Sequence, residues 1–238
     1  MTSAPQFQPL YAQVYDHLIG RLSRGDWKAG EKLPSEFELA DALKVHQGTV
    51  RKALNKLVAE NLLKRRQGKG TYVAEHSDES SLYRFFPYRK RGGELLIPET
   101  TVIKRRVRNL KTIEQEIFDL DTGMAHEVTR VRSLSKAVSI VEVVVQPLEL
   151  FPGVDQIEEL PNSLYALYQD QFDISITEVK DQLSAVQLPS FAAKALGLDK
   201  GAIALETIRQ SIDLKNRVVE LSTAYCNSND FVYSVTLK

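Results

Sequence analysis

The sequence predicts an α+β protein with two domains of different character. In the first third of the chain, short amphipathic helices precede one glycine-tipped hairpin. From about residue 82 onward, long β-favouring runs are interspersed with a few short helices. Because these strands and helices do not alternate regularly, they indicate an antiparallel sheet rather than a parallel βαβ arrangement.

Two helices are predicted before the first turn signal. Apolar residues recur every four positions from Leu10 to Leu22 and predict a first helix. Residues 33–36 predict the start of a second helix, because Ser35 and Glu38 have the spacing of a capping box. Residues 44–48 are then expected to form a tight turn into a third helix.

The third predicted helix carries a basic face and leads directly into a basic hairpin. Residues 50–58 place apolar side chains at helical spacing, while Arg51 and Lys52 fall on the opposite face. Residues 62–66 and 71–73 read as strands around a glycine turn. Helix, turn, helix and hairpin together indicate a winged helix-turn-helix, whose cations suit a DNA groove and its phosphates. The alternative is an ordinary solvated basic surface.

Composition excludes several other classes. Residues 1–76 carry 12 Lys/Arg against 8 Asp/Glu, whereas residues 77–238 carry 19 against 23. A basic front before an acidic rear fits a nucleic-acid module attached to a second domain. The single cysteine, Cys226, rules out a disulfide framework and a thiolate metal site. Without a long apolar run or a signal peptide, we expect a soluble, cytoplasmic protein that does not contact membranes.

The rear half is expected to contain an internal repeat. Residues 113–145 align without a gap onto residues 191–223, sharing a helix, a Leu-Asp-x-Gly turn and a strand-turn-strand. We infer two helix–hairpin units related by a pseudo-twofold axis, with a binding cleft where they meet. The predicted helices of this half are 112–120, 163–171 and 189–198, and the predicted strands are 101–107, 127–134, 140–146, 174–188, 202–212, 218–225 and 231–237.

Candidate chemistry in the rear half favours binding over catalysis. The sequence contains no phosphate-binding loop, no zinc-protease motif and no nucleophile elbow, and its four histidines are scattered. Glu142 and Glu220, inside apolar strands, are the pair that could act as acid and base. We expect no enzyme, no cofactor and no metal. Arg130 and Arg132 lie two apart on a strand and share a face, which suits an anion. The alternative is a surface row of salt bridges.

The front run LPSEFELADALKVHQGTVRKALNKLVAENLLKRRQGKGTYV resembles the N-terminal domain of GntR-family bacterial transcription regulators. The rear half is similar to the UTRA domain of the HutC subfamily, a chorismate-lyase-like sheet that binds small effectors without turning them over. TRVRSL, QPLELFPG, NSLYALYQDQFDI and VVELSTAY carry this second resemblance. The two resemblances together imply a DNA-binding domain at residues 1–75, a linker at 76–83, and an effector-binding and dimerisation domain at 84–238.

The first resemblance implies a set of DNA-facing residues. Family members commonly have arginine where Phe37 stands, and serine–arginine where His46 and Gln47 stand. Because arginine reads guanine and glutamine pairs with adenine, we expect Gln47 to move the half-site preference towards A·T. The implied DNA-binding residues are Ser35, Glu36, His46, Gln47, Thr49, Arg51, Lys52, Arg66, Lys69 and Gly70.

The second resemblance implies an effector site. Residues 83–89 are aromatic and basic where phosphosugar-binding members usually have a Ser/Thr loop, and residues 226–230 also depart from the family pattern. We therefore expect an anion with an apolar or aromatic body. The implied effector-binding residues are Arg84, Arg89, Arg130, Arg132, Glu142, Ser163, Tyr165, Glu220 and Tyr225.

Together these features predict a bacterial transcription regulator, a repressor that binds a palindromic double-stranded operator as a homodimer. A small anionic metabolite is expected to release it from the DNA. Two alternatives remain open at this point. One is a winged-helix module fused to a catalytically active lyase-like domain, and the other is an architectural DNA binder with a structural rear domain.

Overall fold

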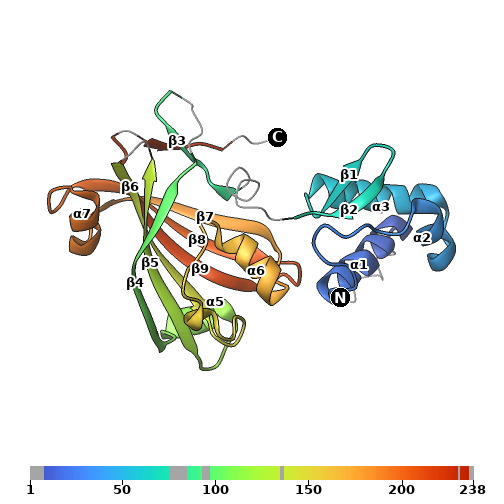
Figure 1. Cartoon of the computed structure of the whole chain (residues 1–238), viewed down its shortest axis with the longest axis horizontal. Helices are drawn as coiled ribbons and strands as arrows, with labels where there is room; N and C mark the ends of the chain where they lie inside the picture. Colours follow the sequence, from blue (N-terminus) through green and yellow to red (C-terminus); the bar gives the residue numbers. More distant parts are fainter. Residues whose placement is uncertain (1–7, 76–84, 93–96, 135–136, 230, 236–238) are drawn as a thin grey trace, which may run out of the picture. The chain divides into compact units, whose positions relative to one another are not determined.

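A computed structural model describes residues 8–75, 85–92, 97–134, 137–229 and 231–235 of the chain. The chain divides into two compact units, Met1–Glu75 and His76–Lys238, which Figure 1 colours in sequence order. The predicted linker, residues 76–83, lies outside the described residues.

Three helices build the first unit: α1 (Leu10–Ser23), α2 (Glu36–Leu43) and α3 (Gln47–Ala59). The predicted capping box is present, since the Ser35 hydroxyl accepts from the Glu38 N–H and the Glu38 carboxylate accepts from the Ser35 N–H. Lys44 adopts a left-handed conformation and ends α2. The turn is therefore shorter than predicted, and α3 already begins at Gln47.

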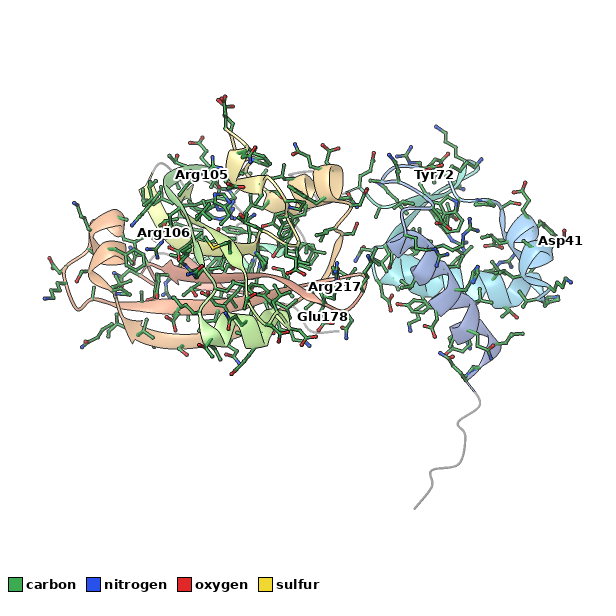
Figure 2. All side chains as sticks on the ribbon, turned by 90° about the horizontal axis from the view of Figure 1, so that it is seen from below. Asp41, Tyr72, Arg105, Arg106, Glu178 and Arg217 are labelled. Atoms are coloured by element: carbon green, nitrogen blue, oxygen red, sulfur yellow. The ribbon has the colours of Figure 1, made fainter. Side chains whose placement is uncertain are left out.

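The wing follows α3 as an antiparallel pair, β1 (Leu63–Arg66) and β2 (Gly70–Val73), close to the predicted bounds. A third stretch of chain pairs with β2, because the Leu33 N–H donates to Thr71 O and the Val73 N–H donates to Glu31 O. Tyr72, labelled in Figure 2, lies in this central strand and pairs with Lys32. The wing is thereby tied to the chain segment that leads into α2.

The second unit contains a six-stranded antiparallel sheet in the order β4-β5-β6-β9-β8-β7 (Figure 1). The predicted α+β class with an antiparallel sheet is confirmed. Its strands are β4 (Glu99–Asn109), β5 (Met124–Leu134), β6 (Ala137–Pro147), β7 (Ile176–Gln187), β8 (Ile203–Asp213) and β9 (Val218–Cys226). Its helices are α5 (Thr112–Phe118), the 3₁₀ turn η1 (Val154–Gln156), α6 (Leu164–Phe172) and α7 (Ser190–Leu196).

The sheet order agrees with a doubled unit, since β4-β5-β6 and β7-β8-β9 meet at the central β6–β9 pair. Helices α5 and α7 also coincide at the predicted offset of 78 residues. The gapless alignment is wrong across the hairpins, however. Arg130 pairs with Glu142, whereas Ile208, its counterpart, pairs with Thr223 instead of Glu220. Four residues separate β8 from β9 but two separate β5 from β6, so the longer turn shifts the register.

Helices cover the two faces of the sheet differently. Helix α6 packs on one face, where Leu164 and Tyr168 join a cluster with Val144 of β6. Helices α5 and α7 pack on the other face, against residues such as Val145 and Val141. Along each strand, alternate residues therefore point either to α6 or to α5 and α7.

A second, two-stranded sheet pairs β3 (Tyr88–Lys90) with β10 (Phe231–Tyr233). The sequence predicted a strand at 231–237 but no partner strand near residue 88. Phe86, Tyr88 and Phe231 form one buried cluster with Ile140 of β6. This small sheet therefore holds the segment 85–88 against the α6 face of the large sheet.

Candidate functional site

The DNA-facing candidates of the first unit gather around one acidic side chain. Glu36, at the first position of α2, accepts from Arg51 Nε at 2.8 Å and from Arg65 Nη2 at 2.9 Å. Gln47 Nε2 lies 3.3 Å from the same carboxylate. Burial by itself raises the pKa of Glu36, but Arg51 and Arg65 bring that pKa below its ordinary value. One ionised carboxylate thus joins α2, α3 and β1.

The remaining DNA candidates stand around this centre. His46 caps α3, its Nδ1 accepting from the Gly48 N–H at 3.0 Å. The Lys52 ammonium lies over the Tyr11 ring and the Arg66 guanidinium over the Tyr72 ring. Ser35 caps α2, Thr49 is half-buried on α3, and Lys69 and Gly70 form the exposed end of the wing. The structure therefore places all ten predicted residues on the second helix, the third helix and the wing.

In the second unit, a cavity of about 50 Å³ lies between the α6 face of the sheet and the segment 85–88. Strands β5, β6, β8 and β9 supply the floor, and the first residues of α6 supply part of the wall. Its charged and hydroxyl-bearing lining residues are Tyr88, Arg130, Arg132, Glu142, Ser163, Tyr165, Thr207, Arg209, Glu220 and Ser222.

Arg130 and Arg132 share one carboxylate. Both arginines donate through Nε and Nη2 to the same oxygen, Glu142 Oε2, at 2.5–3.3 Å. The exposed fractions of Arg130 and Arg132 are 2% and 7%, which excludes the alternative of a surface salt-bridge row. Burial alone would raise the pKa of Glu142, but the charges of the two arginines lower it to about 2.

Glu220 has a different environment on the same cavity. It accepts hydrogen bonds from the Tyr168 hydroxyl and from Ser211 Oγ, and Tyr165 OH lies 2.8 Å from that serine. Burial raises the pKa of Glu220, and the nearby charge of Glu142 contributes to the increase. The two glutamates face one cavity, but one is held ionised and the other is pushed towards protonation.

A chain of buried hydrogen bonds extends from Glu220 to the far edge of the sheet. Gln146 donates to the Tyr168 hydroxyl at 2.6 Å, and the His126 ring lies 2.9 Å from the Gln146 carbonyl oxygen. Arg105 on β4, which is labelled in Figure 2, donates to His126 Nε2 and to the main-chain carbonyls of residues 154, 155, 157 and 158.

The segment over the cavity is fixed to β8. Arg209 binds Asp181 through two hydrogen bonds, at 2.6 and 2.7 Å, and its third nitrogen donates to Phe85 O. The Tyr88 hydroxyl donates to Thr207 Oγ1 at 2.8 Å. Phe85, Phe86 and Tyr88 all line the cavity, so the aromatic side chains of the segment 85–88 form one of its walls.

Two predicted effector residues are not in the cavity. Tyr225 lies on the opposite face of β9, where its ring packs edge-on against Phe191 beside α7. Arg89 on β3 turns its guanidinium back onto the carbonyls of Phe86 and Tyr88. Both assignments are therefore corrected. Arg84 lies outside the described residues.

The structure also supplies cavity residues that the sequence did not indicate. Thr207 and Arg209 come from β8, and Ser222 comes from β9. Nothing in their spacing differs from an ordinary strand, and only the strand order, with β8 next to β9, brings them to the cavity. Because side chains two apart on a strand share a face, Ser222 lies on the same face as Glu220, whereas Tyr225 lies on the other.

The described residues show neither a cluster of metal ligands nor a membrane-spanning helix. Among the described ranges, no group of three or more His, Cys, Asp or Glu side chains could hold a metal ion. No helix in the described part of the chain is long and apolar enough to cross a membrane. Cys226 is buried, and burial raises the pKa of its thiol to about 12.

Comparison with protein families gives two matches. Residues 10–73 match the model for bacterial regulatory proteins of the gntR family. Residues 95–232, more than half of the chain, match the UTRA domain model.

Individual proteins agree with this division. The HTH-type transcriptional repressor NagR of Bacillus subtilis is 28% identical over 219 residues, covering 87% of this chain and 86% of NagR. The histidine utilization repressor of Pseudomonas putida is 41% identical over 75 residues, which are 32% of this chain and 30% of that protein. The crystal structure of PhnF from Mycobacterium smegmatis superposes with a TM-score of 0.56 at 19% identity, covering 94% of this chain and 99% of PhnF.

Proposed function

Because the chain belongs to the GntR family of bacterial regulatory proteins and carries a UTRA domain, we propose that it represses transcription and that a small ligand releases it from its operator. The chain is a DNA-binding transcription regulator and not an enzyme. The relatives that match it along most of their length are likewise transcription regulators. Catalysis by a fused lyase-like domain is not supported by these relatives.

The proposal that the first unit reads DNA rests on the cluster of side chains around Glu36. A free recognition helix would leave Arg51, Gln47 and the wing arginine Arg65 to move independently. Here one carboxylate holds all three on a single surface, which supports readout of the major groove by α3 with β1–β2 on the neighbouring phosphates. Such a regulator would act in the cytoplasm, as a homodimer on a palindromic site.

The proposal that the second unit binds a ligand rests on the buried arginine pair on the cavity wall. Two guanidiniums and the N-terminal end of α6 surround a space that is closed over by aromatic side chains. Guanidinium groups and helix N-termini both favour anions. The proposed effector site is therefore this cavity, with Arg130, Arg132, Glu142, Ser163, Tyr165 and Glu220 as its polar residues.

Capture of genomic fragments tests the DNA half. The full-length protein should retain a small set of duplexes sharing a two-fold symmetric sequence, and its affinity should fall steeply with salt, as phosphate contacts require. Retained fragments would then be challenged with metabolites of the genes that they control. An architectural binder would retain DNA without sequence preference and would not respond to any metabolite.

A further inference from the structure

Arg130 keeps one buried nitrogen without a hydrogen-bond partner. Its Nε and Nη2 donate to Glu142, but Nη1 does not. Among the described residues, this is the one buried side-chain nitrogen or oxygen without a partner. Since an unpaired buried donor is costly, an acceptor brought to Arg130 in the cavity would be stabilised by this guanidinium. Arg130 itself is 2% exposed and lines the cavity.

The charges around this atom leave at most one positive charge uncompensated. Arg130 and Arg132 together meet the single negative charge of Glu142. Arg209 is neutralised by its two hydrogen bonds to Asp181.

Glu220 can lower that balance but cannot raise it. Its carboxyl group has hydroxyl partners, and within the described ranges no arginine or lysine forms an ion pair with it. With Glu220 protonated the balance at the cavity is one positive charge, and with Glu220 ionised it is zero. Binding of an anion would therefore favour the protonated form of Glu220.

The size of the cavity restricts the group that fits beside Arg130. The cavity of about 50 Å³ exceeds the roughly 10–15 Å³ that a single water needs, so it has room for a compact head group. The first residues of α6, Ser163–Tyr165, line one side, and the aromatic side chains of Phe86 and Tyr88 line another. A flat head group with an apolar neighbour suits this combination.

We propose that the effector is a monocarboxylate, whose carboxylate binds Arg130 Nη1 at the N-terminal end of α6 and whose apolar part contacts Phe86 and Tyr88. This inference rests on the proposed effector role of the cavity and narrows it to one charge class. A phosphate ester, with a second pKa near 6, is largely a dianion at neutral pH. It would leave one negative charge buried without compensation.

Matched pairs of acids test the proposal on the full-length protein. Benzoate and phenyl phosphate form one pair, and glycerate and glycerol 3-phosphate form another. In calorimetric titrations at about pH 8, at least one carboxylate should bind, about tenfold or more tightly than its phosphate counterpart. Near pH 5.5, where phosphate esters carry close to one charge, the difference should become smaller.

Two variants sharpen the test. Glu142→Gln raises the charge balance by one, so phosphate esters should gain about tenfold relative to carboxylates. Glu206→Gln, a glutamate of β8 outside the cavity, should leave the preference unchanged. If Glu142→Gln does not fold, the comparison of the two pH values on the unaltered protein decides.

Two results would overturn the proposal. One is a phosphate ester that binds as tightly as its carboxylate at pH 8. The other is failure of both carboxylates to bind while a neutral sugar or a phosphate releases the protein from DNA. In either case the effector role would stand. That role fails by a different result, namely that no metabolite in a broad panel changes operator affinity.

Discussion

Gln47 begins α3, with its amide nitrogen 3.3 Å from Glu36, and so stands where the recognition helix meets the cationic surface. Glutamine pairs two-pronged with adenine, and such a pair contributes about 1–3 kcal/mol of discrimination. Selection from random duplexes should return A·T at one position of each half-site. Gln47→Arg should change that position to G·C, and Gln47→Ala should leave it without preference. Guanine there, unaffected by Gln47→Ala, would contradict the assignment.

Glu36 is predicted to orient the DNA-reading side chains. Glu36→Gln removes a negative charge next to the phosphates and frees Arg51 and Arg65 from their shared carboxylate. Affinity for random duplexes should therefore rise, while the ratio of operator to random binding should fall by about tenfold. Binding isotherms at several salt concentrations measure both. Asp41→Asn makes the same charge change at an exposed position of α2 (Figure 2) and should keep the ratio.

Strand alternation predicts some of the cavity residues from the sequence but not others. Arg130 and Arg132 were placed together by their spacing alone, and both contact Glu142. Tyr225 was assigned to the same site by resemblance, although its odd separation from Glu220 puts it on the other face. Arg209 could not be assigned, because its place in the cavity depends on β8 lying beside β9.

The wing depends on glycine at position 70. Its φ is +123°, and a Cβ atom there would lie 2.7 Å from Lys32 Cε. Gly70→Ala should therefore destabilise the first unit by about 1–3 kcal/mol. The only tryptophan of the chain, Trp27, is buried in this unit, so its fluorescence reports denaturant unfolding there. Gly20→Ala in α1, where a Cβ has room, should instead stabilise the unit by up to about 1 kcal/mol.

Strand β5 carries a pH-sensitive contact. Burial lowers the pKa of His126 from its ordinary value of 6.5, and the charge of Arg105 adds to this decrease. The unfolded chain then takes up a proton below about pH 6.5 that the folded chain does not. The free energy of unfolding of the second unit should therefore fall as the pH falls from 7 to 5.5. Carboxylates with lowered pKa, such as Glu127, act only in a more acidic window, below about 4.5.

Near-ultraviolet circular dichroism of the tyrosines can follow that unfolding, since the tryptophan lies in the other unit. His126→Gln should remove this decrease, and because the raised pKa of Glu220 acts in the opposite direction, the free energy of unfolding of this variant should stay level or rise as the pH falls. His17→Gln, which replaces an exposed histidine of α1, should leave the decrease intact. A decrease that persists in His126→Gln would assign the proton to another group.

Element types and most element bounds could be predicted from the sequence, whereas the pairing of strands far apart in the chain could not. Apolar periodicity and the capping signal at Ser35 are local, so α1, α2 and the wing followed from them. The pairing of β3 with β10 joins residues about 140 positions apart and has no local signal. The same limit applies to the aromatic wall of the cavity, which this pair holds in place.

Ligand binding in the second unit and DNA binding in the first are coupled if the ligand and the operator favour different conformations of the protein. Linkage then requires that the ligand weaken operator binding by the same factor by which the operator weakens ligand binding. A coupling of about 1–3 kcal/mol, or roughly 5–150-fold, is typical of such systems. Fluorescence anisotropy of labelled operator, with and without ligand, gives the first factor, and calorimetry with and without operator gives the second.

Arg130→Gln provides the matched control for this coupling, because it changes the second unit and leaves the residues of the first unit untouched. The variant should bind operator as tightly as the unaltered protein, yet the ligand should no longer release it.

Inserting five base pairs between the half-sites turns one half-site to the opposite side of the duplex, so a dimer should lose most of its affinity while a monomer would not. Unequal coupling factors would mean that the ligand acts elsewhere than on the operator-bound equilibrium.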